Sequence, residues 1–585
     1  MKKMKFKYLI LAGLMATATA CTEDFLTSVP KGKLSDAVLN TPDGIEALCT
    51  SAYSALAGPE GDNLAFLSPT NNWIYGEVRA ENAYKGGGGI GDLWEFNAFE
   101  TFTGVYPNNG LLDRKWFHMY ISVQRTNSAI RQLNEVTETQ VPLKKVRLGE
   151  MKFLRAHYYF ELSRLFNKIP YFDENVAIDD YTKVSNTQYT RDQILEKIAA
   201  EFAAAAKLLP ETQPQKGRVT KYAALAYEAK AILYRAYKQN ADNTVTSAPD
   251  NTLLNRVVAL CDSVSMGGYG LLADFQQLAE VEYEHGSESV FGIEYSINDG
   301  TTNGRINWSN LLNVPKGPAY SGDGFFQPSQ NLVNSYKTDA NGIPQIDTYN
   351  TSNLMTVADG LAVNVDPRLD FTVGRIGVRW KDYAAGPYDI NWSREPATYG
   401  TYGTKKFLVS PNSPNLVKGW PWGGSSLNYQ VIRFADVLLW KAEALIELGR
   451  QSEALPLINA VRMRAKNSKY VLAWNNTSSS DFAARYKISA YQDGVNCSWT
   501  QDFARKALRF ERKLELAMEG ERFFDLVRWG AADQVLNNEY FAKEKEIRDY
   551  LKNAKFVKGR DEYFPIPQNQ INYSAGLYSQ NPGYN

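Results

Sequence analysis

Residues 429–449 read YQVIRFADVLLWKAEALIELG and continue at 450–462 as RQSEALPLINAVR. Apolar residues recur at three- and four-residue steps in both segments, so each segment has a single apolar helical face. Gly449 stands where a helix end favours a left-handed residue, so the chain turns back at once. The pattern predicts an antiparallel helix pair of the tetratricopeptide type. A lone pair of this kind cannot bury its apolar face without neighbours.

Further amphipathic segments supply those neighbours. Thr41-Pro42 and Thr220 are typical helix starts, and Pro210 is a stop signal. We therefore predict a mainly α fold, a tetratricopeptide-like bundle of about eight paired helices, interrupted by insertions rather than built on a strict 34-residue repeat. Besides the quoted pair, the expected helices cover residues 37–57, 111–133, 143–166, 191–209, 220 onward and 253–265.

Between about residues 271 and 428 helical periodicity fades, and Gly, Pro, Asn and aromatic residues dominate. Short strands are predicted at 288–295 and at 371–380, the latter after an Asp366-Pro367 turn. The expected organisation is thus a helical region at 46–270 with an aromatic loop near 70–100, an irregular half at 271–428 that carries the ligand face, and helical pairs with an extended tail at 429–585.

Composition excludes several classes of function. Lys plus Arg equals Asp plus Glu, so the formal net charge is zero and nothing steers the chain toward nucleic acid. The three histidines are scattered, which disfavours a zinc site or a histidine-based triad. Acidic residues are plentiful, but no motif places two of them as a glycosidase requires. We expect no catalytic residues, no metal and no cofactor.

A longer motif near the C-terminus points to a family. Residues 511–530 end in EGERFFDLVRWG, which resembles the C-terminal signature of the SusD/RagB family. Other motifs follow in family order: EMKFLRAHYYFEL at 150–162, GRVTKYAALA at 217–226, DPRL at 366–369 and YFPIPQ at 563–568. The resemblance implies a non-catalytic lipoprotein of the cell outer membrane. It would capture a glycan at the cell surface and deliver it to a TonB-dependent, SusC-like transporter docked on the helical face.

The N-terminal residues agree with that location. A Lys-rich start and an apolar run to Ala20 predict a signal peptide at 1–20, too short to span a membrane. Ala18-Thr-Ala-Cys21 resembles a bacterial lipobox, with Ala18 where Leu is typical. We expect lipidation of Cys21 and a tether at 21–45. The acidic residues after Cys21 resemble a surface-export signal. The remaining three cysteines are odd in number and indicate no disulfide framework.

A neutral sugar is held by flat aromatic rings and by hydroxyl-binding polar groups. Trp116, Trp440, Trp529 and Trp380 lie in periodic segments and are assigned to the core. The ligand candidates are the aromatics in Gly-, Asn- and Pro-rich segments: Trp73, Trp94, Trp308, Tyr320, Trp392 and Tyr399. Neighbouring polar side chains able to bind hydroxyls are those of Glu77, Asn82, Asp92, Asn307 and Asp323.

Three alternatives stay open. Some members of the SusD/RagB family serve peptide uptake, so the ligand could be a peptide. A glycan-cleaving enzyme and a bare peptide-binding scaffold are further readings, although the bare scaffold leaves the aromatic insertions unexplained. The glycine run at 86–89 is predicted to be a mobile loop, and it lacks the Lys-Ser/Thr and the βαβ setting of a phosphate loop. The sequence does not identify the glycan, and it does not decide whether a structural calcium ion is bound.

Overall fold

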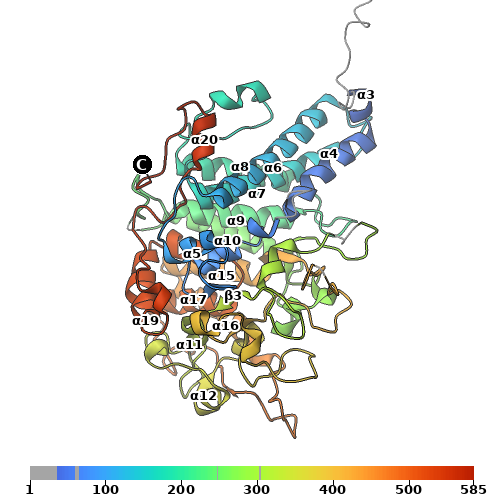
Figure 1. Ribbon diagram of the computed structural model, residues 1–585. Coiled ribbons are helices and arrows are strands. Elements are labelled where there is room, and N and C mark those ends of the chain that lie inside the picture. Colours follow the sequence, from blue (N-terminus) through green and yellow to red (C-terminus); the bar gives the residue numbers. More distant parts are fainter. Residues whose placement is uncertain (1–35, 59–64, 247, 302–304, 420, 585) are drawn as a thin grey trace, which may run out of the picture.

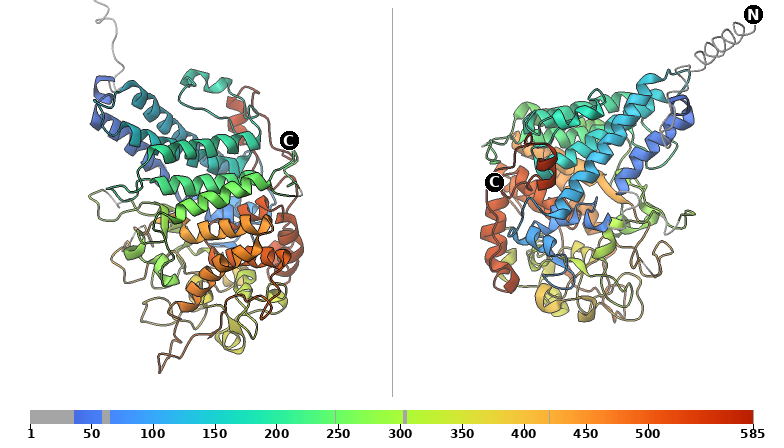
Figure 2. Two further views of the ribbon diagram at one scale, coloured as in Figure 1. Left: turned by 180° about the vertical axis from the view of Figure 1, so that it is seen from behind. Right: turned by 45° about the horizontal axis from the view of Figure 1, so that its top comes forward.

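The computed structural model describes residues 36–58, 65–246, 248–301, 305–419 and 421–584 (Figure 1). The expected signal peptide and Cys21 lie outside these residues. Helices predominate, and most stack in successive layers, as the reverse view shows from blue through green to orange (Figure 2). Within the described ranges, no helix is both long and apolar enough to cross a membrane.

Nine helices of the described ranges form this stack. α4 packs on α6 and α7, and each helix from α6 to α9 packs on the next. α10 packs on α15, which in turn packs on α16 and α17. The predicted tetratricopeptide-like bundle is therefore confirmed. The helices are α4 (Pro42–Ser54), α6 (Gly110–Glu135), α7 (Lys144–Phe166), α8 (Arg191–Leu208), α9 (Lys221–Ala236), α10 (Asn251–Ser265), α15 (Phe434–Glu447), α16 (Gln451–Asn467) and α17 (Gln501–Glu515).

The predicted helix ends are present. Gly449 has φ of +74°, and the Arg450 N–H donates to the Leu445 carbonyl at 2.8 Å, which closes α15 and directs the chain into α16. The Thr41 hydroxyl accepts from the Gly44 N–H at the start of α4, and Thr220 caps α9 in the same way. The opening stretch departs from the prediction in one respect, because Tyr429–Arg433 form a strand, β7, before α15 begins.

The insertion between α10 and α15 is irregular, as predicted. In the described residues it contributes short helices and short strands. The strands pair in two-stranded sheets, β1 with β3, β2 with β7, β4 with β8 and β5 with β6, of which β1 comes from before α6 and β8 from between α16 and α17. The strands are β1 (Ala83–Gly86), β2 (Ser289–Ile293), β3 (Phe325–Pro328), β4 (Asn364–Val365), β5 (Val373–Gly374), β6 (Gly403–Thr404) and β8 (Arg485–Tyr486). The short helices include α11 (Gln330–Ser335), α12 (Val357–Ala362), α13 (Arg368–Thr372) and α14 (Pro396–Tyr399).

The strand predicted at 371–380 is wrong for most of its length. Residues Arg368–Thr372 form α13, and only Val373–Gly374 are extended as β5. The Asp366 carboxylate accepts from the Arg368 N–H at 3.0 Å, and Pro367 precedes the helix. An acidic acceptor followed by proline favours the first turn of a helix, which outweighs the alternation of apolar residues here.

The C-terminal elements wrap the bundle. α18 (Arg522–Arg528) and α19 (Ala542–Glu544) follow α17, and the tail then runs extended, with the Phe564 N–H donating to the Leu165 carbonyl at 2.8 Å. The tail then forms α20 (Gln568–Tyr573), which packs on α6, and the described chain continues beyond it to residue 584 (Figure 1).

A buried array of charges joins the bundle to the irregular half. Glu511, Glu515 and Glu519, at the start of the family-like motif, line up along α17 and the turn after it, and all are buried. The Glu511 carboxylate pairs with Arg368 of the irregular half at 2.7 Å and with Arg462 of α16 at 2.8 Å. The partners of the three carboxylates span both halves: Arg368, Lys406, Arg433, Arg462 and Arg464.

Candidate functional site

A loop rich in glycine links β1 to α5 (Trp94–Thr101) and carries the most open aromatic group among the predicted candidates. The loop backbone lies against β3, since the Gly87 N–H donates to the Gly324 carbonyl at 2.9 Å. A Cβ at Gly87 would lie 2.5 Å from the Phe325 ring, so only glycine permits this approach. We call residues 86–94 with Asp323 and Arg394 the glycine-loop platform.

The platform is held from within by a buried lysine. The Lys85 ammonium donates to the Gly89 carbonyl at 2.8 Å and to the Asp92 carbonyl at 2.5 Å. Burial lowers the pKa of Lys85 to about 8, against the opposing effects of Glu100 and Asp92. These two bonds fix the curve of the loop, so the predicted mobility of the glycine run is countered by an internal anchor.

Two apolar side chains stand open on the platform. Trp94, the first residue of α5, is 54% exposed, and Ile90 is 52% exposed. Leu93, which precedes Trp94, has φ of +51°, a left-handed conformation that turns the chain abruptly into α5. An exposed indole at a rigid helix start offers a flat apolar surface whose position is fixed by the backbone.

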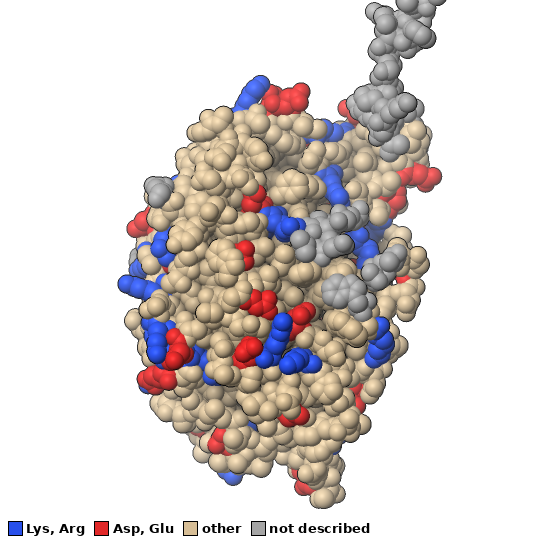
Figure 3. Space-filling view, in the orientation of Figure 1, with Lys and Arg blue, Asp and Glu red and all other residues tan. Residues whose placement is uncertain are grey.

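Charged groups lie beside this surface. Arg394 donates to the Asp92 carboxylate at 3.2 Å and to the Asp323 carbonyl at 3.3 Å, and its guanidinium lies 3.6 Å from the Asp323 carboxylate. All three side chains are partly exposed. Burial raises the pKa of Asp323, and the Arg394 guanidinium opposes that shift. On the face seen in Figure 3 acidic and basic groups are intermixed, without a broad region of one sign.

Four of the predicted ligand aromatics lie inside the protein. Trp73 is 1% exposed and contacts the rings of Phe96 and Phe326. Tyr399 is fully buried against Tyr550. Because none of these rings is open to solvent, a ligand reaches them only if the surrounding side chains move. We therefore assign them to packing rather than to the ligand surface: Trp73, Tyr320, Trp392 and Tyr399.

Tyr320 and Trp392 belong to a second hydrophobic cluster, which forms within the irregular half around Trp380. The Trp380 indole N–H donates to the Tyr320 hydroxyl at 3.0 Å, and that hydroxyl donates to the Val409 carbonyl at 2.8 Å. The rings of Trp392 and Trp380 lie 5.1 Å apart. A loop-rich half needs a core of its own, and these aromatics supply it. The assignment of Trp380 to the core is confirmed.

The remaining candidates divide in the same way. Trp308, the first residue of the short 3-10 helix Trp308–Asn313, is half-buried. Glu77, Asn82 and Asn307 are buried, whereas Asp92 and Asp323 reach the platform. Sequence reasoning missed Arg394 and Ile90. Arg394 lies some 300 residues from Asp92 along the chain, and no spacing links the two.

One group of metal-ligating side chains occurs among the residues that the structure describes: Glu284, His285 and Glu294. The His285 Nε2 lies 3.3 Å from the Glu294 carboxylate, and the hydrogen bond between them raises the pKa of His285. Asn428 binds both carboxylates, through its N–H to Glu284 and its amide to Glu294. This set of contacts accounts for the group as an ion pair, and it lies apart from the platform in the sequence and in its contacts.

Known proteins resemble this chain along its whole length. The model of the SusD family matches residues 287–584, just over half of the chain, and a model described as "Starch-binding associating with outer membrane" matches residues 90–233. A SusD-like protein P2 of Formosa agariphila is 25% identical over 594 residues, which covers 100% of both chains.

Solved structures share the fold. A SusD homolog of Bacteroides thetaiotaomicron has a TM-score of 0.69 at 20% identity, covering 94% of this chain and 98% of that one. Surface glycan-binding protein A of Bacteroides thetaiotaomicron, solved in complex with laminarihexaose, has a TM-score of 0.64 at 20% identity, covering 92% and 99%. The family model, the relatives and the helical architecture agree, and the chain belongs to the SusD family.

Proposed function

We propose that this protein captures a glycan at the glycine-loop platform without cleaving it and delivers it to a TonB-dependent, SusC-like transporter. The observation that carries the proposal is the exposed Trp94 indole beside the Asp92–Arg394–Asp323 group. The indole supplies a stacking face for the C–H surface of a sugar ring, and the charged groups supply acceptors and donors for its hydroxyls. Both features rest on backbone that the core holds in place.

The class of ligand is supported by the relatives. A laminarin-binding SusD-like protein shares this fold with a TM-score of 0.65 at 22% identity, and the glycan-binding protein described above was solved with a bound oligosaccharide. Asp92, Asp323 and Arg394 together leave one negative charge, which the Lys85 ammonium beneath the loop offsets. Neutral glycans fit this platform, since no excess of one sign would select an ionic ligand.

A non-catalytic role is supported by the position of the two carboxylates. Glycoside hydrolysis requires one protonated and one ionised carboxyl group flanking the bond. On the platform both Asp92 and Asp323 face the same Arg394 guanidinium, with N–O distances of 3.2 and 3.6 Å. The guanidinium therefore occupies the space between the two carboxylates, where a scissile glycosidic bond would have to lie.

Anchoring through Cys21 completes the proposal. The family model that matches residues 90–233 is described as associating with the outer membrane. A single acyl chain holds a protein only marginally, so stable residence requires the several chains that bacterial lipoproteins carry. Tethering of this protein beside its transporter would raise the local ligand concentration, and a free-protein Kd of about μM to mM suffices.

The experiment is a glycan and peptide panel on the soluble chain from residue 22 onward, read by calorimetry, with every hit incubated overnight. Binding of a glycan without new reducing ends supports capture. New reducing ends would establish cleavage and refute the non-catalytic assignment. Binding of peptides alone would reassign the platform to peptide uptake, and nanomolar affinity for a simple glycan would contradict the expected need for the transporter.

A further inference from the structure

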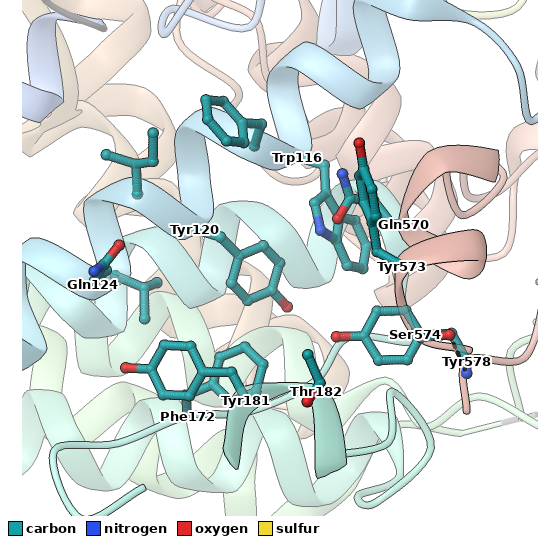
Figure 4. A pocket seen from close by; sticks show the side chains of 13 residues that line it. Trp116, Tyr120, Gln124, Phe172, Tyr181, Thr182, Gln570, Tyr573, Ser574 and Tyr578 are labelled. Carbon is teal, nitrogen blue, oxygen red and sulfur yellow. Dashed lines mark hydrogen bonds between the residues drawn. The ribbon is translucent and has the colours of Figure 1, made fainter. Parts of the chain in front are cut away.

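An aromatic pocket lies on the helical bundle, away from the glycine-loop platform. One wall is formed by α6, and the opposite wall by Phe172 and by the 3-10 helix Ile178–Lys183. α20 and the residues after it close one end, as the close view shows (Figure 4). The cavity has a volume of about 250 Å³. None of the described residues of the pocket belongs to β1, α5 or the loop between them.

The wall of the pocket is a continuous set of rings. The rings of Phe172 and Tyr181 stack 4.3 Å apart, and the ring of Tyr120 meets that of Phe172 edge-on at 5.7 Å. Trp116 lies 5.0 Å from Tyr120. The hydroxyls of Tyr120 and Tyr181 are engaged from behind, by the Pro170 carbonyl and by Arg131, which fixes the orientation of both rings. The aromatic wall is therefore preformed.

The polar groups of the pocket carry no charge. No Asp, Glu, Lys or Arg lines it among the described residues, and the polar side chains are amides and hydroxyls. Gln124 and Thr182 are exposed at the rim, and their side chains have no hydrogen-bond partner in the described structure. Tyr573 from α20 is 75% exposed and, among the described residues, also stands without such a partner. These groups are free to bind a ligand, and none of them would hold an ionic one.

The dimensions select a small occupant. A helix with its side chains is about 10–12 Å across, so 250 Å³ would hold only about 3 Å of its length. Pockets for drug-sized ligands have volumes from about 300 Å³ upward, so the smaller volume of this pocket has room for one or two compact rings. Flat rings, uncharged hydrogen-bonding groups and this volume together match one class of ligand.

We infer that the aromatic pocket is a second binding site for neutral saccharide, taking one or two sugar rings of a chain that the platform also holds. One ring face stacks on Tyr120 and Tyr181, and its hydroxyls bind Gln124, Thr182 and Tyr573. The inference takes the class of ligand, a neutral glycan, from the proposed function. The place where that ligand binds follows from the pocket alone. Two sites on one protein retain a long polysaccharide more tightly than either site alone.

The test uses calorimetry with a fixed panel of neutral hexasaccharides, namely laminarihexaose, maltohexaose, cellohexaose and xylohexaose. Four proteins are compared: the soluble chain, Trp94→Ala, the double variant Gln124→Ala with Tyr573→Ala, and all three changes together. Gln124 and Tyr573 are exposed and make no internal bonds within the described ranges, so the double variant should keep its melting temperature.

The expected result is that the platform variant and the pocket variant each retain binding to the sugar that wild type binds, and that the triple variant loses it. Each single-site loss should be at least about fivefold, equivalent to about 1 kcal/mol. Hydrogen exchange supplies a second readout, with protection by the sugar expected at 110–124 and 568–578 in the Trp94→Ala protein.

Two outcomes overturn the inference. If the pocket variant matches wild type and no protection develops at 568–578, the pocket is not a saccharide site, while the platform proposal stands. If no hexasaccharide binds any of the proteins, both proposals fail together. If the pocket and triple variants lose binding while Trp94→Ala binds as wild type does, the platform is refuted and the pocket is the sole site.

Discussion

Replacement of Trp94 by Ala tests the platform most directly. The side chain is 54% exposed, and a Trp presents up to about 250 Å² of surface, so about 135 Å² is open to a ligand. A sugar covers one face of the indole, roughly half of that area, or about 70 Å². At about 25 cal/mol per Å² the lost contact is worth about 1.7 kcal/mol, which corresponds to about a 17-fold rise in Kd.

The assay is calorimetric titration of the glycan that wild type binds, together with a melting curve. Alanine is a good helix former and Trp94 begins α5, so the melting temperature should stay unchanged. Tyr283→Ala is the matched control, because this ring is also exposed, at 39%, but lies on the 3-10 helix Val281–Tyr283. A change in Kd of less than about twofold for Trp94→Ala, at equal stability, would refute the stacking argument.

Four further outcomes are expected. Arg394→Gln should weaken glycan binding several-fold in the same titration, because Asp92 then loses the cation that orients it; an unchanged Kd would remove the charged group from the site. Glu515→Gln should lower the free energy of unfolding by about 3–5 kcal/mol in urea titrations, because the buried guanidinium groups lose a counter-charge. The control Glu453→Gln removes an exposed carboxylate and should lower the free energy of unfolding by at most about 1 kcal/mol. Burial raises the pKa of Asp525, but two neighbouring guanidinium groups outweigh that effect and lower the pKa to about 2. Because this pKa lies below the value in the unfolded chain, the unfolded chain binds more protons as the pH falls. The free energy of unfolding that Asp525 contributes should therefore decrease between about pH 4 and pH 2, which urea midpoints measured across that range would show. Cys21→Ala should release the protein from outer-membrane fractions while glycan binding persists, and continued sedimentation with membranes would contradict the lipid anchor.

The helical scaffold was predictable because its signals are local. A 3.6-residue period, the capping Thr220 and the left-handed Gly449 each act within a few residues, and the structure contains all of them. Where two local signals conflicted, after Asp366-Pro367, the helix start prevailed over the alternating pattern. The division of the chain into three regions remains a prediction.

The proposed ligand surface was only partly predictable. Glycine and proline around Trp73 and Trp392 indicate irregular backbone, but irregular backbone can be buried when it builds its own core, as the cluster around Trp380 does. Exposure of a ring depends on distant segments that cover it, which composition does not encode. The platform needed Asp92, Asp323 and Arg394 from three separate stretches, and only their folded positions bring them together.

The charge array around α17 also has a consequence for the order in which the protein is made. The carboxylates of Glu511, Glu515 and Glu519 are synthesised after the arginines that they neutralise. Until they arrive, Arg462 has no carboxylate partner among the described residues, and the other buried guanidinium groups share those of Asp366 and Glu288. A nascent chain that lacks α17 cannot close its core around these cations. We therefore expect the core to close only once the chain is nearly complete.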